Sequence, residues 1–373
     1  MNELRRNIII SSQIGGGVEP VIDIDNYLTI VALEDSLTAA LSGNTVEYCV
    51  DGDGNWKTLS SNTASESINK GQTLSFRGNL TPAFNKGVGT FKISKSCDLT
   101  GFCNSLLFGD NAKNNNSLSG KYHAFYKLFY NCTTIKNVSS NFLPAATLEQ
   151  GCYYYMFYKC TSLTTAPKLP ATTLKSDCYG YMFNSCSSLT TAPELPATTL
   201  AKSCYSNMFS YCTSLTTTPT LPATTLANYC YSNMFSYCSS LTTAPQLPAT
   251  TLADSCYSNM FYYCTSLTTA PELPATTLTT YCYDYMFTHC HSLTTAPQLP
   301  ATTLASNCYF SMFASCSKLN YIKAMFTTTP STTYTNNWVS NVASTGTFVK
   351  NKNATWNVTG NHGIPSGWTV QTA

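Results

Sequence analysis

Cysteine offers the most reactive side chain in this sequence, which has 373 residues and eighteen cysteines. Fourteen of the cysteines form two series with a spacing of 26 residues, and the second series follows the first by eight residues. Thiols at regular spacing could form disulfides, bind a metal or act as nucleophiles. The first series is Cys152, Cys178, Cys204, Cys230, Cys256, Cys282 and Cys308, and the second is Cys160, Cys186, Cys212, Cys238, Cys264, Cys290 and Cys316.

The spacing favours free thiols over disulfides or metal ligands. If each unit carries a helix, its two thiols lie about 12 Å apart along the helix axis, which is too far for a bridge. An irregular earlier unit has Ala124 at the place of the first cysteine and keeps Cys132. Alanine can replace a cysteine that packs as a small hydrophobe. A separation of eight residues is not a chelating spacing either, and we expect no metal site and no cofactor.

Other catalytic residue types are sparse. The chain has four histidines, which leaves little material for general-base or zinc chemistry. Glycoside hydrolysis needs two carboxylates about 5–9.5 Å apart, whereas the acids of the repeats occur singly at variable positions: Asp177, Glu194, Asp254 and Glu272. We expect no catalytic residues, and a glycan-active enzyme is a minor alternative.

Composition excludes further classes of function. Charged residues make up 10% of the chain, with 20 basic against 18 acidic side chains. A nearly neutral chain lacks the basic surface of nucleic-acid-binding proteins. No apolar run approaches the ~20 residues of a membrane span, so we expect no membrane-spanning segment.

The repeated unit predicts the elements that position these residues. Leu189–Ala192 is short and rich in β-branched residues, and Pro193 ends it because proline cannot donate to a sheet. From Leu200 to Cys212 the recurring residues fall within one half of a helix surface at about 100° per residue. A period of 26 residues with leucines at fixed places is typical of leucine-rich solenoids. We therefore predict an α/β solenoid, a parallel sheet backed by short helices, over residues 97–318.

Three further segments flank the solenoid. Residues 1–20 form an N-terminal arm, residues 21–96 a small antiparallel β-sandwich, and residues 319–373 a cap over the last unit. The strands expected in the sandwich are Tyr27–Val31, Thr45–Val50, Trp56–Leu59, Gln72–Arg77 and Thr90–Ser94.

Two sets of residues are candidates for the surface. The recurring tyrosines after the first cysteine of each unit form a predicted core column, whereas tyrosines at less regular positions, such as Tyr211 and Tyr237, are expected nearer the surface. The strand threonines are the predicted binding face: Thr164, Thr165, Thr190, Thr191, Thr216, Thr217, Thr242, Thr243, Thr268, Thr269, Thr294 and Thr295.

One element of the unit carries a family resemblance. The stretch Met208-Phe209-Ser210-Tyr211-Cys212-Thr213-Ser214-Leu215 resembles the repeated AFxxCxxL element of BspA-like leucine-rich repeat proteins. The flanks, including Glu47-Tyr48 and Phe76-Arg77-Gly78-Asn79, resemble those of leucine-rich repeat proteins from gut Bacteroides and their phages. The resemblance implies a surface or virion interaction module, and it carries no catalytic motif.

These observations predict a non-enzymatic recognition protein. Because Arg5 and Arg6 precede only three isoleucines before polar residues, the sequence shows no export signal, and we expect a phage virion component, either a head fibre or a tail-associated adhesin. Its expected partners are a host-surface glycan or protein and, through residues 1–20, other virion proteins. A homo-oligomer is compatible with the sequence. The alternative is an adhesin on the bacterial cell surface.

Overall fold

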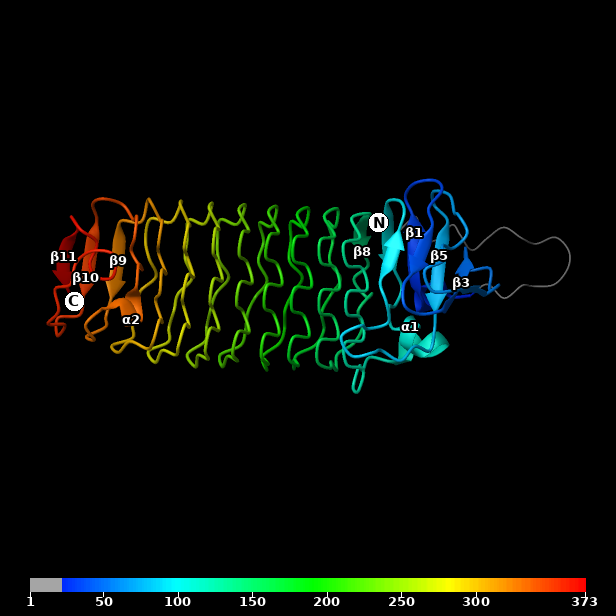
Figure 1. Ribbon diagram of the computed structural model, residues 1–373, viewed down its shortest axis with the longest axis horizontal. Coiled ribbons are helices and arrows are strands. Elements are labelled where there is room, and N and C mark those ends of the chain that lie inside the picture. Colours follow the sequence, from blue (N-terminus) through cyan, green and yellow to red (C-terminus); the bar gives the residue numbers. More distant parts are fainter. Residues whose placement is uncertain (1–21) are drawn as a thin grey trace, which may run out of the picture.

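The structure of the protein is a computed structural model that describes residues 22–373, and the arm predicted over residues 1–20 lies outside the described residues. A sheet occupies the N-terminal end, a row of similar coils follows, and a small sheet covers the C-terminal end (Figure 1). The strands are β1 (Leu28–Ala32), β2 (Ala39–Leu41), β3 (Val46–Val50), β4 (Lys57–Leu59), β5 (Thr73–Arg77), β6 (Phe91–Ile93), β7 (Cys97–Thr100), β8 (Ile135–Val138), β9 (Tyr321–Ala324), β10 (Thr347–Lys350) and β11 (Thr369–Thr372). The helical segments are α1 (Ser105–Phe108), α2 (Thr332–Thr335) and the 3-10 turns η1 (Ile24–Asn26) and η2 (Gly109–Asn114).

The N-terminal sheet is mixed, with the order β4-β3-β5-β1-β7-β8. It is antiparallel from β4 to β7, whereas β7 and β8 are parallel; β2 and β6 form a separate antiparallel pair. The five expected strands are confirmed, and the pairing among β1 to β6 is antiparallel as predicted, but the sheet as a whole is mixed; the sandwich arrangement stays a prediction. The physical reason for the mixed sheet is that β7 pairs at both edges, so the sheet continues into the repeats and shares one hydrophobic core with them. The segment boundaries at residues 20, 96 and 318 stay predictions.

The second half of each repeat is a series of tight turns, so the predicted helix is wrong. In one coil Asp177, Tyr181 and Ser185 have φ values of 57°, 55° and 62°, and the same four-residue spacing of left-handed residues recurs in every coil up to Ser315. An α-helix requires negative φ throughout. The coil therefore turns inward two adjacent residues out of every four, as in Met182 and Phe183, which are both fully buried.

Backbone hydrogen bonds explain why turns replace the helix. Met182 N donates within its own turn to Tyr179 O at 3.2 Å, whereas Phe183 N donates to Met208 O of the following coil at 3.0 Å. This alternation recurs along the array, and every bond between coils on this side runs from an earlier N–H to a later carbonyl. A helix satisfies its N–H groups internally, so it would leave adjacent coils without these bonds.

The strand half of each repeat pairs more sparsely than predicted. Parallel bridges of one residue join Thr191 to Thr217 and Thr243 to Thr269, and regular strands form here only at the two ends, as β8 and β9. The parallel direction is as predicted, but a continuous sheet is not formed. Pro193 and its counterparts end each extended segment within a few residues, because proline has no N–H to donate.

The interior of the coils consists of columns of identical residues. All eighteen cysteines are buried free thiols, as expected. In the second cysteine series each Sγ donates to a phenylalanine carbonyl of an earlier coil, 31 residues before Cys160 and 29 residues before the others; Cys212 lies 3.1 Å from Phe183 O and Cys238 lies 3.2 Å from Phe209 O. Burial raises the pKa of Cys212 to about 12, so the thiol remains protonated at neutral pH.

The predicted tyrosine column is confirmed as part of this core. Its rings stack at centroid distances of 5.7–6.1 Å with interplanar angles of 2–10°, and each residue is 1% exposed. The members are Tyr153, Tyr179, Tyr205, Tyr231, Tyr257, Tyr283 and Tyr309.

The C-terminal segment covers the end of these columns. Phe313 N donates to Trp338 O at 2.8 Å, so the coil pattern continues beyond the last repeat cysteine. The Trp338 ring is fully buried and lies 6.1 Å from the Tyr309 ring and 6.2 Å from the Phe313 ring. Its Nε1 donates to Gly363 O at 2.9 Å. Parallel pairing of β9, β10 and β11 completes the end of the stack.

Candidate binding surface

The structure brings the twelve predicted threonines together in two adjacent exposed rows. Part of their hydrogen-bonding capacity is used between coils: Thr216 Oγ1 lies 3.3 Å from Thr190 O, and Thr268 Oγ1 lies 3.1 Å from Thr242 O. Threonines repeated in this way present a uniform polar surface. Their role in binding stays a prediction.

A second surface lies on the side of the turns, where tyrosines at less regular positions form an ordered row. We call Tyr211, Tyr237, Tyr263 and His289 the aromatic row. Successive rings stack at centroid distances of 4.3, 4.9 and 4.0 Å. Each residue has a left-handed φ between 58° and 62°. This backbone conformation directs the side chain outward between the buried positions, and Tyr211 is 46% exposed.

Partial burial favours the neutral forms of Tyr211, Tyr237 and His289 in the aromatic row. Desolvation raises the pKa of Tyr211 and of Tyr237; Tyr237 adds to the rise at Tyr211, whereas the hydrogen bond with Tyr211 opposes the rise at Tyr237. Burial and the neighbouring His291 lower the pKa of His289, so its imidazole is neutral at pH 7. Uncharged rings can stack without electrostatic repulsion between them. The row is therefore a continuous apolar stripe that is fixed to a hydrogen-bonded scaffold.

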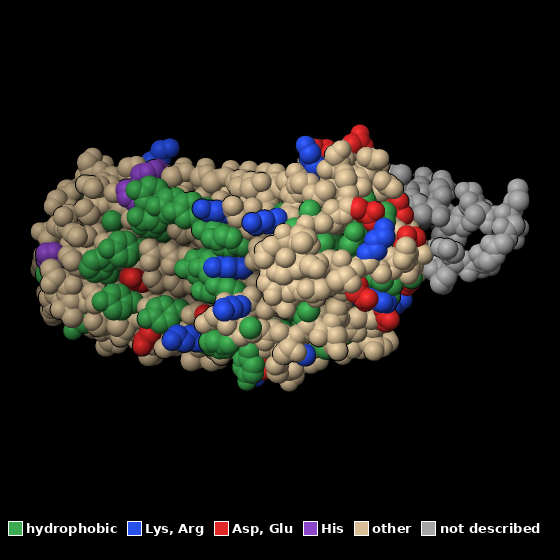
Figure 2. All heavy atoms as spheres, turned by 45° about the vertical axis from the view of Figure 1, so that its right-hand side comes forward, with side chains coloured by type: hydrophobic (Ala, Val, Ile, Leu, Met, Phe, Trp, Pro, Cys, Tyr) green, Lys and Arg blue, Asp and Glu red, His purple; other side chains and the backbone are tan. Residues whose placement is uncertain are grey.

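Nearer the N-terminal sheet, a second group of tyrosines is combined with lysine. Tyr155 stacks on Tyr181 at 4.5 Å, and Tyr130 stacks on Tyr158 at 4.9 Å. Lys127 Nζ lies 4.9 Å from the centre of the Tyr130 ring and 5.5 Å from that of Tyr155. Figure 2 shows hydrophobic side chains and lysines interspersed over one face of the stack. Aromatic and basic groups thus share this surface.

A groove of about 380 Å³ lies between this N-terminal group and the aromatic row. It is lined by aromatic side chains, by the ammonium-bearing chain of Lys159 and by small polar residues. The lining residues are Tyr158, Lys159, Tyr181, Asn184, Ser185, Asn207, Ser210 and Tyr211.

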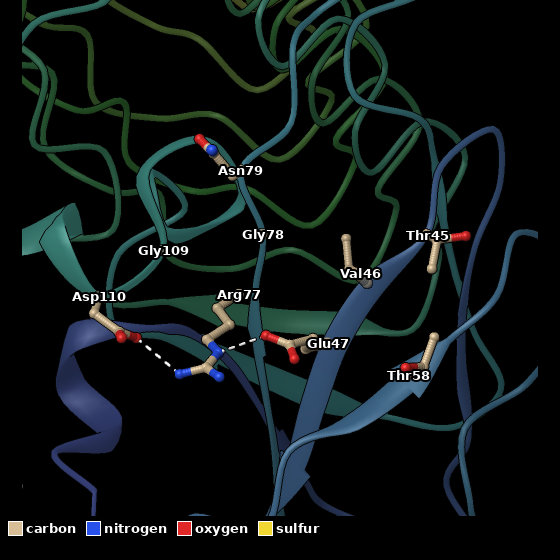
Figure 3. Close-up of a pocket in the computed structure, with 9 residues that line it drawn as sticks. All are labelled: Thr45, Val46, Glu47, Thr58, Arg77, Gly78, Asn79, Gly109 and Asp110. Atoms are coloured by element: carbon tan, nitrogen blue, oxygen red, sulfur yellow. Dashed lines mark hydrogen bonds and ion pairs between the residues drawn. The ribbon is translucent and has the colours of Figure 1, made fainter.

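A larger hollow of about 420 Å³ lies at the N-terminal sheet, and it brings together the flanking motif residues Glu47, Arg77, Gly78 and Asn79 (Figure 3). Arg77 Nε lies 2.8 Å from Glu47 Oε2, and its Nη1 lies 3.0 Å from Asp110 Oδ1. The guanidinium also stacks over Trp56 at 4.1 Å. Because two carboxylates already neutralise Arg77, we assign it to holding β3, β5 and η2 together.

The described residues show no cluster of metal-ligating side chains. Across residues 22–373 no three side chains among histidine, cysteine, aspartate and glutamate converge to hold a metal ion. Of the acids expected to stand alone, Glu194 Oε2 accepts a hydrogen bond from Thr220 Oγ1 at 3.3 Å. Within this part of the chain no helix is long and apolar enough to cross a bilayer.

Sequence reasoning placed Tyr211 and Tyr237 near the surface but did not predict that they stack. Their column becomes visible only when every fourth residue of the coil is known to be left-handed. A signal was present one turn earlier in the same coils, where Asn207, Asn233 and Asn259 occupy equivalent places. Asparagine tolerates positive φ better than most residues.

Comparison with known protein families gives a match over the coils. A family model described as a BspA type Leucine rich repeat region (6 copies) matches residues 125–242 and 230–351. These residues include the threonine rows, the aromatic row and the groove, and they make up more than half of the chain. No curated protein and no solved structure matches the chain.

Proposed function

The chain belongs to the BspA-type leucine-rich repeat family, and from this we propose that it is a non-enzymatic recognition protein that binds a host-surface glycan or protein. Repeat proteins of this family are typically non-catalytic. The observation that carries the proposal is the aromatic row, with rings 4.0–4.9 Å apart on the turn side. Tyrosine supplies large contact area and few torsions to immobilise, which favours its use at binding surfaces.

Rigidity supports the use of this row in binding. Phe209 N donates to Met234 O and Tyr211 N donates to Ser236 O, at 3.0 and 2.8 Å. Similar bonds hold every coil of the row to the next. A preorganised surface loses little conformational entropy when a ligand binds. The row is therefore suited to an extended ligand that contacts several coils at once.

We further propose that the protein acts as part of a phage virion, as a head fibre or tail-associated adhesin, with residues 1–20 contacting other virion proteins. The eighteen buried free thiols support synthesis in a reducing compartment, where disulfides are rare. Burial raises the pKa of Cys204 to about 12 as well, so such thiols are poor nucleophiles after release to an oxidising medium.

Two measurements test the proposal. Mass spectrometry of purified phage particles and of host cell-surface fractions would locate the chain: stoichiometric peptides in particles support a virion component, whereas peptides found only on bacterial surfaces refute it and favour a cell-surface adhesin. Binding of the purified full chain to host cells tests recognition. We expect Tyr237→Ser to weaken binding, because it removes one ring of the aromatic row. The fold should be retained, since Ser185 and Ser315 show that serine is accepted in this column. Unchanged binding would remove the aromatic row from the proposal.

A further inference from the structure

We propose that the groove beside Ser185 binds one sugar of an acidic polysaccharide, with a pyranose ring stacked on Tyr211 and its carboxylate paired with Lys159. This inference rests on the proposed recognition function and specifies the ligand class. The groove lies where one series of stacked rings ends and another begins, has a polar floor and lies in the part of the repeat array that is rich in lysine. These three features point to the same ligand.

The groove exists because Ser185 is small, whereas the following coils carry rings at its position and the preceding coil carries Lys159. Ser185 occupies the column of Tyr211, Tyr237 and Tyr263, with a left-handed φ of 62°. Among the described residues Tyr211 stacks only on Tyr237, so the ring face toward Ser185 has no aromatic neighbour. Adjacent coils in a parallel arrangement are about 4.8 Å apart. Omission of one ring thus leaves room for a flat group about as thick as a sugar ring.

A second aromatic face ends at the same groove. Tyr181 stacks on Tyr155 of the preceding coil at 4.5 Å, and the following coil has Asn207 at the equivalent position. Tyr181 lies in the coil of Ser185 and Tyr211 in the following coil, and both rings line the groove. The apolar C–H face of a pyranose can pack on such rings while its hydroxyls point outward.

The floor of the groove is polar and fixed. Asn184 is buried, accepts a hydrogen bond from Ser185 Oγ at 2.8 Å, and donates weakly to Asn207 O at 3.4 Å. Ser210 is 2% exposed and lies in the same lining. An amide and hydroxyls placed beside an aromatic wall are the groups that orient sugar hydroxyls in binding sites.

Charge selects an anionic sugar. Lys159 is exposed at the groove, and its Nζ lies 5.5 Å from the centre of the Tyr158 ring, whose face it partly covers. Residues 121–212 contain seven lysines and three acidic residues, whereas residues 230–316 contain three acidic residues and no lysine or arginine. One ammonium group in the groove matches one carboxylate per sugar. The surrounding lysines would attract further charges along a polyanion.

The test compares three polymers on the full chain by titration calorimetry: polygalacturonate as the acidic glycan, dextran as a neutral glycan and polyglutamate as an acidic peptide. Ser185→Tyr fills the groove with the residue that three other coils carry at the same φ, so the fold should be retained. Lys159→Gln removes the cation. Tyr229→Asn is the matched control, because Tyr229 is 43% exposed but does not line the groove.

We expect polygalacturonate to bind more tightly than dextran or polyglutamate. Ser185→Tyr should weaken the binding of polygalacturonate about tenfold or more. Lys159→Gln should reduce both the affinity for polygalacturonate and the salt dependence of that affinity, whereas Tyr229→Asn should change neither quantity. Equal binding of dextran, tighter binding of polyglutamate, or unchanged binding by folded Ser185→Tyr would each overturn the inference. If the chain binds host cells and Ser185→Tyr binds them equally well, the groove is wrong while the proposed function stands. Absence of cell binding by the unmodified chain would refute the proposed function itself.

Discussion

Replacement of Asp284 by asparagine should stabilise the protein above about pH 6, because this carboxyl group is buried without a compensating cation. Asp284 is 8% exposed, and its Oδ1 has no hydrogen-bond partner among residues 22–373. Desolvation by burial raises the pKa of Asp284 from 3.8 to about 6, and a hydrogen bond with Ser258 opposes this rise. Three other coils carry a serine at the same position, as Ser206, Ser232 and Ser258 do.

The magnitude follows from the pKa difference. One pKa unit corresponds to about 1.4 kcal/mol, so a rise of about 2 makes the ionised carboxylate cost about 3 kcal/mol of folding free energy. The folded chain binds this proton more tightly than the unfolded chain does. The cost is therefore complete above the folded pKa of about 6, declines as the pH falls toward the unfolded value of 3.8, and disappears below it.

The effect can be measured by urea unfolding, followed by tyrosine fluorescence, at about pH 8 and about pH 4. The quantity compared is the free energy of unfolding of the variant minus that of the unmodified chain at each pH. Asp284→Asn should be more stable at the higher pH and equal at the lower. Glu272→Gln is the control, since Glu272 is exposed and neighbouring coils carry Gln246 and Gln298 in its place. A gain of the same size at both pH values, or no gain at the higher one, would refute the buried-charge explanation.

Three further predictions concern the core and the turns. Tyr231→Phe should raise stability by about 1–2 kcal/mol, because the buried Tyr231 hydroxyl has no partner within residues 22–373; Tyr27→Phe should lower it, since Tyr27 donates to Asp110 at 2.9 Å. Equal effects in chemical denaturation would contradict this. Cys238→Ala should lower the free energy of unfolding by about 1 kcal/mol more than Cys230→Ala, because of these two thiols only that of Cys238 donates to a carbonyl, at 3.2 Å. Equal melting temperatures of the two variants would show that this hydrogen bond does not contribute to stability. Tyr229→Asn should raise the free energy of unfolding by about 0.5–1 kcal/mol, because Tyr229 has a φ of 59° that asparagine adopts more readily. A lower melting temperature would show instead that the Tyr229 ring stabilises the fold by packing.

The repeat period and the buried positions could be predicted from the sequence because each coil repeats the same core residues. The helix could not be excluded by the same reasoning. Cys204, Tyr205, Met208, Phe209 and Cys212 fit one half of a helix surface over eight residues, but their true period is four. A four-residue period drifts by about 40° per step around an α-helix. The choice between the two conformations depends on hydrogen bonds to adjacent coils, which are not local in the sequence.

The binding surface was predicted less completely than the core. The threonines follow from the β-branched pattern, and their exposure agrees with it. The groove depends instead on Ser185, an ordinary residue that differs from its counterparts Tyr211 and Tyr237 only by the absence of a ring. Such an omission has no signature in composition or spacing. It becomes meaningful only when stacking between coils is seen in three dimensions.

The one-way hydrogen bonds between coils also give the stack an electrical polarity. On the turn side, peptide N–H groups point toward the C-terminal cap, as from Tyr179 N to Cys204 O. Aligned peptide dipoles add, as they do in an α-helix, so the N-terminal end of the array is its negative pole. The lysines gather in that half, while residues 230–316 contain only acidic charges. Between residues 121 and 316 the side-chain charges thus offset the backbone field, so the two directions along an array of nearly identical coils differ electrostatically for a charged ligand.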